Sequence, residues 1–368
     1  MPKLRIAGLV ALGAATLLIL NAARFSQLVE TVYARSLYRW LISPLSRFTG
    51  IFPFSVAEVL AIALGIWLLY KLVRAAISLY RARRLNWYAL GRQLTRLGVG
   101  ALVVYVVFNL MWGLNYHRSS FAELSGLPVE PASTEELAVL AEELVHMANA
   151  LREQVTEDEQ GVMTLSTDIR GMFNRAQAGF DNAAKLYPEL GGNFGRPKGV
   201  YFSRFLSLSG ISGIYIPFTG EANVNIDIPH MLLPATTIHE MAHQRGFARE
   251  DEANYIGWLA SRLHPDPDFQ YSGTMLAMIH TMRALYQHDP ERNMEIRELY
   301  SPGVARDLRD WSAYWAQFEG PVERVSTRMN DTYLRANRQS DGVQSYGRMV
   351  DLLLAEFRGQ GDRSLVRD

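Results

Sequence analysis

The stretch that decides the fold and the chemistry of this chain is Thr236-Thr-Ile-His-Glu-Met-Ala-His-Gln-Arg-Gly246. It contains one H-E-x-x-H pentapeptide, in which His239 and His243 flank Glu240. Residues four apart on a helix project from one face, so the two imidazoles can bind one zinc ion while the glutamate reaches its water. The run therefore predicts a helix that carries a metal centre and a general base.

The residues around the pentapeptide favour a helix. Pro234 suits the first turn, and Gly246 offers a stop. Ile238, Met241 and Ala242 form an apolar face separate from the histidines. The alternative is a buried helix whose histidines only hydrogen-bond to backbone groups.

A catalytic zinc site needs a third protein ligand and an open position for water. Glu250-Asp-Glu-Ala-Asn254 resembles the E-x-x-A-D pattern of zinc peptidases with His, His, Glu ligation, so Glu250 is the expected ligand and Asn254 is expected to orient a histidine. Glu252 is the rival, because it shares a helical stripe with apolar residues. A third histidine six residues after His243 is excluded, since Arg249 occupies that position.

Composition limits the other classes of function. The chain has 368 residues, a formal net charge of zero and no cysteine. It therefore has no disulfide and no cysteine nucleophile, and a metal must be held by His, Asp or Glu. No basic aromatic patch or nucleic-acid-binding motif is present.

Three apolar stretches in the first part of the chain, at about 6–23, 52–73 and 97–114, approach the roughly 20 residues that cross a bilayer. They predict a transmembrane region over residues 1–116, followed by a domain over 117–368. The first stretch is also compatible with a signal peptide, but it is longer than the usual apolar core of one.

Positive charge predicts the orientation of these spans in the plasma membrane. The segment between the second and third spans carries seven cations and no acidic residue: Lys71, Arg74, Arg81, Arg83, Arg84, Arg92 and Arg96. Together with Lys3 and Arg5, they place the N-terminus in the cytoplasm and the domain outside. Glu58 would be costly in lipid, so we expect it at the outer interface, where the second span begins.

The domain reads as mostly helical with a small sheet, which gives an α+β fold class. A capping box at Ser133 starts one helix, and a second runs from about 167 to 186. Short strands are expected within 198–203 and 210–227, with Pro217 on an edge strand that could pair with an extended substrate. His230 is expected to pack or cap, and the aromatic residues from Trp311 to Phe318 to join the core.

The three spans, the Gly213-Ile-Tyr-Ile-Pro-Phe-Thr-Gly-Glu-Ala-Asn-Val-Asn225 block, the run from His239 to Asn254 and Asp341-Gly-Val-Gln-Ser-Tyr346 occur together. With them, the chain resembles an uncharacterised family of three-span bacterial membrane proteins, a domain of unknown function grouped with the gluzincin-like zincins. The resemblance covers nearly the whole chain. It implies a zincin-like metallopeptidase domain with His239 and His243 as zinc ligands and Glu240 as catalytic base. Asn254 departs from the aspartate of the wider clan.

The expected activity is zinc-assisted hydrolysis of a peptide or protein in the cell envelope. A donor that stabilises the oxyanion is also expected, and the candidates are Tyr271, His280, Tyr333 and Tyr346. The alternative is an inactive zincin-like membrane protein that binds an envelope partner or peptide. A purely structural zinc is disfavoured, because such sites are usually cysteine-rich.

Overall fold

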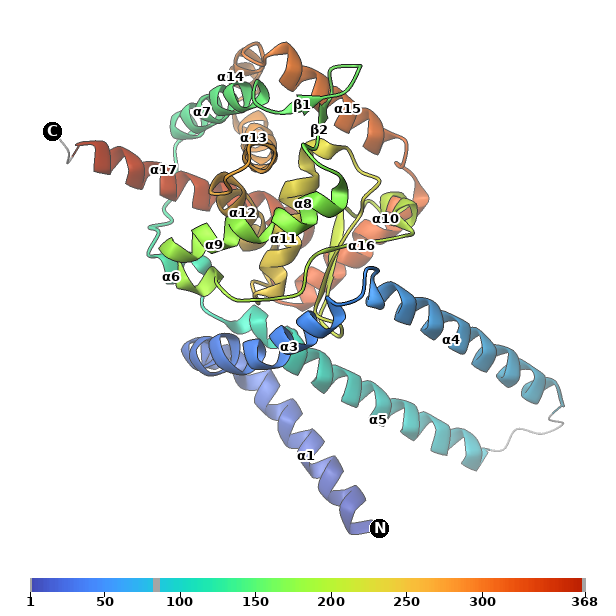
Figure 1. Cartoon of the computed structure of the whole chain (residues 1–368). Helices are drawn as coiled ribbons and strands as arrows, with labels where there is room; N and C mark the ends of the chain where they lie inside the picture. Colours follow the sequence, from blue (N-terminus) through green and yellow to red (C-terminus); the bar gives the residue numbers. More distant parts are fainter. Residues whose placement is uncertain (1, 82–86, 366–368) are drawn as a thin grey trace.

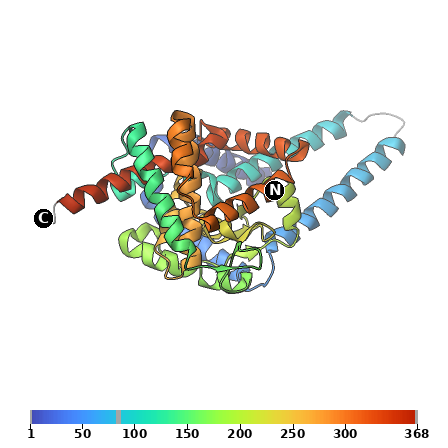
Figure 2. The ribbon, with the colours of Figure 1, turned by 90° about the horizontal axis from the view of Figure 1, so that it is seen from above.

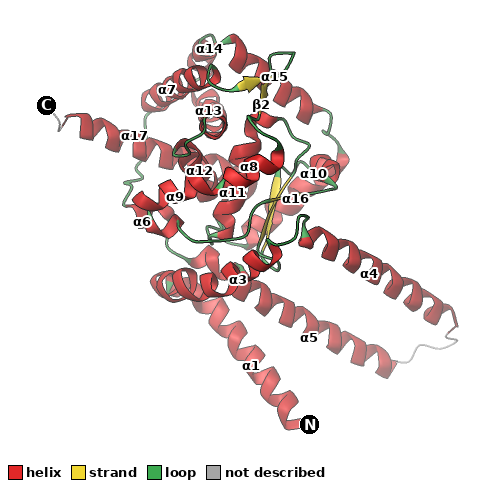
Figure 3. Ribbon diagram, in the orientation of Figure 1, coloured by secondary structure: helices red, strands yellow, loops and turns green. Residues whose placement is uncertain are grey.

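The computed structural model describes residues 2–81 and 87–365 of the chain. Most of these residues are helical, and the strands are few and short (Figure 3). A helical domain contains the sheet, and three long helices project from one side of it (Figure 1). The prediction of a mostly helical chain with a small sheet is confirmed.

The projecting helices correspond to the apolar stretches. They are α1 (Pro2–Asn21), α4 (Val56–Arg81) and α5 (Trp87–Met111). Within α4 and α5, Val56–Ser78 and Leu90–Met111 are long and apolar enough to cross a membrane. A third crossing is reached only if Val10–Asn21 and the helical segment Ser26–Thr49, bent by 113° relative to each other, count as one span. Two of the three predicted stretches are therefore confirmed as candidate spans.

The two candidate spans begin elsewhere than predicted. The second starts at Val56, because residues 51–55 form turns after the preceding helix. The third starts at Leu90 instead of about 97, since Arg92 and Arg96 continue the helix despite their charge. Glu58 lies in the first turn of α4, as predicted, and accepts from the backbone N–H groups of residues 201 and 202.

A helical segment that the sequence did not indicate lies across the base of the domain (Figure 1). We call it the base helix, and it consists of α2 (Ser26–Leu28), η2 (Val29–Tyr38) and α3 (Arg39–Thr49). Tyr38 and Ile42 are fully buried on its domain side, whereas Trp40 is 74% exposed. Its apolar residues are divided between two faces, so the sequence shows no continuous apolar run there.

Twelve helices build the domain within the described residues. They are α6 (Phe121–Ser125), α7 (Thr134–Arg152), α8 (Ile169–Arg175), α9 (Gln177–Leu186), α10 (Ser203–Leu208), α11 (Leu233–Gln244), α12 (Glu250–Arg262), α13 (Pro267–His288), α14 (Pro290–Arg297), α15 (Pro302–Ala316), α16 (Pro321–Ala336) and α17 (Met349–Leu365). Short turns η3 (Gly113–His117) and η6 (Gly342–Arg348) precede α6 and α17. The predicted capping box is confirmed, since Ser133 and Glu136 bond reciprocally at the start of α7. The helix predicted over 167–186 is interrupted at Ala176, which gives α8 and α9.

The main sheet has the strand order β3–β5–β4, with β3 (Lys198–Gly199), β4 (Gly213–Ile216) and β5 (Glu221–Val224). β3 runs parallel to β5 and β4 antiparallel to it, with Tyr215 opposite Ala222. β4 is thus an edge strand, and Pro217 follows it directly, as expected of a proline. A separate hairpin joins β1 (Thr156–Glu157) to β2 (Met163–Thr164).

The core lies where α11, α12 and α13 pack together beneath α7 (Figure 2). Burial of these apolar faces supplies the main driving force for folding. Trp311, Tyr314 and Trp315 pack against the edge of this core, and Phe318 is buried, so the predicted aromatic cluster is structural. His230 also has a structural contact, because its Nδ1 faces the N–H of Leu165 at 3.4 Å.

One buried ion pair ties the base helix to the chain beyond α5. Arg118 donates from Nε to Glu30 Oε2 at 2.8 Å and from Nη2 to Oε1 at 2.9 Å. Both side chains are buried, and the guanidinium lies over the ring of Phe247 at 4.2 Å. Burial alone would raise the pKa of Glu30, but Arg118 and Arg35 hold that pKa below its usual value.

Glu30→Gln should lower the free energy of unfolding by about 3 kcal/mol, because it leaves the Arg118 charge buried without its counter-charge. Denaturant titration of the purified protein in detergent measures the loss. Glu295→Gln is the matched control, since its ion pair with Arg292 is exposed and should matter little. Equal stability of wild type and Glu30→Gln would contradict the role of the pair.

Candidate metal centre

Helix α11 carries the H-E-x-x-H residues through the middle of the domain. As predicted, Pro234 lies in its first turn and Gly246 follows its end, with a left-handed φ of +85°. A Cβ at Gly246 would come within 2.9 Å of Asn115 Oδ1, so glycine is needed for space as well as conformation. The chain reverses there, and α12 packs back against α11.

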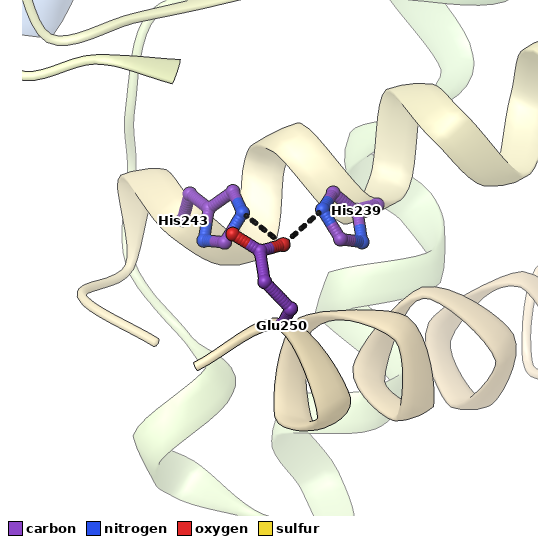
Figure 4. A group of neighbouring side chains, drawn as sticks. All are labelled: His239, His243 and Glu250. Atoms are coloured by element: carbon purple, nitrogen blue, oxygen red, sulfur yellow. Dashed lines mark ion pairs between the residues drawn. The ribbon is translucent and has the colours of Figure 1, made fainter. Parts of the chain in front are cut away.

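The reversal brings the first residue of α12 against both histidines (Figure 4). Oε2 of Glu250 lies 3.3 Å from Nε2 of His239 and 3.4 Å from Nε2 of His243. The exposed fraction is 7% for His239, 6% for His243 and 8% for Glu250. Their ligand atoms all lie within 4.8 Å of one another.

The two candidate third ligands occupy different places. Glu252 Oε1 accepts from the backbone N–H of Phe121 at 2.9 Å and from Arg249 Nη1 at 2.6 Å. Its carboxylate therefore stabilises the start of α6, away from the histidines. Of the two glutamates, the structure brings only Glu250 to the histidine pair.

The donor set suits a divalent cation. Glu240 Oε2 is buried and makes no hydrogen bond to any described residue, and Glu250 Oε2 meets the two imidazoles at distances longer than a usual hydrogen bond. Buried carboxylate oxygens without close donors are costly, and a cation held by Glu250 would lower that cost. Two imidazole nitrogens and one carboxylate oxygen are ligands that zinc takes while keeping a position for water.

The charges of the three residues depend on one another. Burial opposes the imidazolium form of His243, but the adjacent Glu250 outweighs it and raises the pKa of His243 to about 9. Burial likewise opposes the Glu250 carboxylate, but the two histidines lower its pKa to about 2. His243 and Glu250 thus form a buried ion pair, in which the carboxylate stays ionised.

Backbone and aromatic contacts orient His243. Its Nδ1 lies 2.6 Å from the carbonyl oxygen of Phe247, which leaves Nε2 facing Glu250. The ring of Trp112 meets it edge to face, with centroids 5.6 Å apart. Asn254 was expected to orient a histidine, but its Nδ2 donates to the carbonyl oxygen of Tyr346 at 3.0 Å. Its side chain therefore positions η6, because α12 turns it toward that segment.

Glu240 projects from α11 toward the edge strand β4. Burial raises the pKa of its carboxyl group to about 7, although the neighbouring histidines and the backbone N–H of Tyr215 oppose the shift. A Cβ at Gly213 would overlap the Glu240 carboxylate. Glycine at this position therefore allows β4 to pass directly over the glutamate.

Two of the four expected oxyanion donors lie at the centre. The ring of Tyr346 stacks on His239 with centroids 6.5 Å apart, and its hydroxyl lies beside the Glu250 carboxylate. The Tyr333 hydroxyl accepts from Trp112 Nε1 at 3.1 Å and so borders the same site.

The other two donors lie elsewhere. Tyr271 donates to Oδ2 of Asp307 at 2.6 Å, inside a buried network that includes Arg152. His280 lines a cavity of about 380 Å³ behind Tyr346. Burial lowers the pKa of His280 to about 4.

Three aromatic residues of the site were missed in the sequence. They are Tyr38 of the base helix, Trp112 directly after α5 and Tyr215 of β4, and we call them the aromatic support. The hydroxyl groups of Tyr38 and Tyr215 bond at 3.0 Å, and the rings of Trp112 and Tyr215 lie 4.8 Å apart. The one available signal was the position of Trp112 directly after an apolar span.

Comparison with known proteins supplies the family. The chain matches the family described as "Protein of unknown function (DUF3810)" over residues 33–354, and it belongs to that family. No curated protein and no solved structure matches it. The predicted membership of an uncharacterised family is thereby confirmed.

Gly213→Ala should destabilise the fold by about 1–3 kcal/mol, because the new methyl group must displace Glu240 or β4. Gly347→Ala is the control, since a Cβ there meets nothing within 4 Å. Thermal unfolding of both variants gives the comparison. A Gly213→Ala protein as stable as wild type would show that β4 does not approach α11 this closely.

Proposed function

We propose that this member of the DUF3810 family is a zinc-dependent metallopeptidase with a zincin-like domain, anchored in the plasma membrane. The observation that carries the proposal is the convergence of His239, His243 and Glu250, with Glu240 beside them under the free edge of β4. Three protein ligands and an adjacent carboxylate are what metal-assisted hydrolysis of an amide requires.

His239, His243 and Glu250 would hold the zinc ion. Zinc in such a site lowers the pKa of a water molecule and polarises the scissile carbonyl. Glu240 accepts a proton from the attacking water and delivers it to the leaving amine as the C–N bond breaks.

Tyr346 is the better placed of the two tyrosines to donate to the oxyanion. Its hydroxyl lies beside the carboxylate of Glu250 and its ring stacks on His239, whereas the Tyr333 hydroxyl lies against Trp112 and Tyr116. A hydrogen-bond donor aimed at the charge that develops on the carbonyl oxygen lowers the barrier to hydrolysis. Tyr333 then acts by fixing the aromatic support.

The edge strand provides a place for an extended substrate. β4 pairs with β5 on one side only, and the N–H of Tyr215 points to the other side, toward Glu240. A peptide that adds along this edge would pass its backbone over the catalytic carboxylate.

The orientation in the membrane follows from charge and from the fold. The N-terminus of α1, the end of α4 and the start of α5 lie on the side remote from the domain (Figure 1). Cations gather there, including Arg74, Arg81 and Arg92. Positive residues favour the cytoplasm, so three crossings would place the N-terminus inside and the domain on the extracytoplasmic side.

Metal binding tests the ligand set. The purified wild-type protein should bind one zinc ion, and His239→Ala and Glu250→Ala should each weaken binding by at least about tenfold, because each removes a ligand. Glu252→Gln is the matched control and should bind as wild type does. Metal analysis after equilibrium dialysis measures the content. Loss of zinc from Glu252→Gln but not from Glu250→Ala would overturn the assignment.

Hydrolysis tests the role of Glu240. Envelope proteins in mild detergent, incubated with purified wild-type protein, should acquire new N-termini that mass spectrometry detects. Glu240→Gln should keep its zinc and form them about 10²–10⁴ times more slowly, because the general base is lost. If wild type and variant release the same fragments at the same rate, the chain is not this hydrolase, and a role in binding without cleavage takes its place.

A further inference from the structure

The candidate site lies one residue beyond a membrane span. Trp112 directly follows α5, whose apolar segment ends at Met111. Its ring contacts His243, and its Nε1 donates to Tyr333 at 3.1 Å. Phe108, one turn back within α5, also meets the Tyr333 ring edge to face. The span and the metal centre are therefore in direct contact.

The base helix forms the floor of the same site. The Tyr38 hydroxyl lies 3.2 Å from each of the carbonyl oxygens of His243 and Gln244, at the end of α11. On the opposite face of this helix, Trp40 is 74% and Phe48 61% exposed. Exposed aromatic side chains beside candidate spans are typical of the boundary between bilayer and water. Only the width of one helix thus separates the site from that boundary.

The edge strand points from the site toward this floor. The start of β4 lies over Glu240, at Gly213. The turn after its end contacts the base helix, where Thr49 Oγ1 donates to the carbonyl oxygen of Thr219 at 2.9 Å, and Gly220 packs against Ser46. A peptide paired with the free edge of β4 would therefore run between the membrane side of the domain and the catalytic carboxylate.

The candidate span in α4 is exposed along its length. The apolar segment Val56–Ser78 of α4 buries none of its side chains against the described chain. Glu221 holds the start of α4 by accepting from the N–H groups of Val56 and Ala57. Trp112, by contrast, follows the end of α5. Both views show α4 and α5 leaving the domain at separate points (Figures 1 and 2).

An exposed apolar stripe on α16 ends at the site. On α16, Val322, Val325, Met329 and Tyr333 recur at helical spacing and are 58%, 55%, 69% and 39% exposed. The stripe ends at Tyr333, which contacts Trp112. A continuous apolar surface that ends at a site is better suited to an apolar chain than to a soluble, polar peptide.

We infer that the substrate is an integral membrane protein, cut within about ten residues of the point where its chain leaves the bilayer, a length that spans roughly 33 Å when extended. This rests on the proposed function. The substrate's own transmembrane helix occupies the lipid beside α4 and α5, and its emerging segment pairs with β4 on the way to Glu240. Such a substrate reaches the site by diffusion within the membrane.

The test uses the full-length protein in membranes. Vesicles that carry wild-type protein or Glu240→Gln are first fused to native membranes. The fused membranes are then incubated with the soluble envelope proteins, and new N-termini are mapped. We expect the Glu240-dependent termini to fall in integral membrane proteins, within about ten residues of the outer end of a span. Termini that cluster in soluble proteins or in lipid-anchored proteins without a span would overturn the substrate class while leaving the hydrolase intact. An absence of Glu240-dependent termini would overturn the proposed function and this inference with it.

A second measurement tests whether the substrate's attachment to the membrane, and not only its sequence, determines the rate of cleavage. The segment around a mapped cleavage site is presented once next to its own span in a vesicle and once as a free peptide at the same bulk concentration. The anchored form should be cut at least about tenfold faster, because the membrane raises its local concentration at the site. Met329→Glu, on the apolar stripe, should slow cleavage of the anchored form more than that of the free peptide. Equal rates for both forms would contradict entry from the bilayer.

Discussion

The structure depends on the packing of the motif helix α11 against the aromatic support. The end of α11 leaves carbonyl oxygens that the helix itself cannot satisfy, and the Tyr38 hydroxyl lies within hydrogen-bonding distance of two of them, those of His243 and Gln244. Tyr215 bonds to the same hydroxyl, and Trp112 packs on the His243 ring. Membrane-proximal chain, sheet and motif helix therefore meet at one point, and the position of the histidines follows from that contact.

Buried hydrogen bonds in the same region also stabilise the position of α11. Gln244 donates to Ser46 in the base helix and to the carbonyl oxygens of Gly195 and Gly220. Gln244 and Ser46 would each lose a bond if the base helix moved away, and unsatisfied buried groups are costly. The N-terminal region is thus part of the domain's framework as well as its membrane anchor. Removal of the spans together with the base helix would expose the floor of the candidate metal centre.

Local patterns were sufficient to predict the centre of the site. Pro234, the apolar face of the motif helix and Gly246 fixed the limits of α11, and they did so through backbone rules that need no tertiary information. The choice between Glu250 and Glu252 could not be made this way, since both lie in the first turn of α12 and differ only in direction. The chain reversal at Gly246 brings the Glu250 carboxylate to the histidines. The Glu252 carboxylate instead accepts from the N–H of Phe121. Tyr38 could not be found in the sequence, because it meets His243 across 205 positions of chain.

The most direct measurement is an anomalous-difference map from crystals of the full-length protein grown with zinc. The account predicts one strong peak between Nε2 of His239, Nε2 of His243 and a carboxylate oxygen of Glu250, at about 2.0–2.2 Å from each, with the remaining position open toward Glu240. A peak elsewhere, or a zinc ion closed off by a fourth protein ligand, would contradict it.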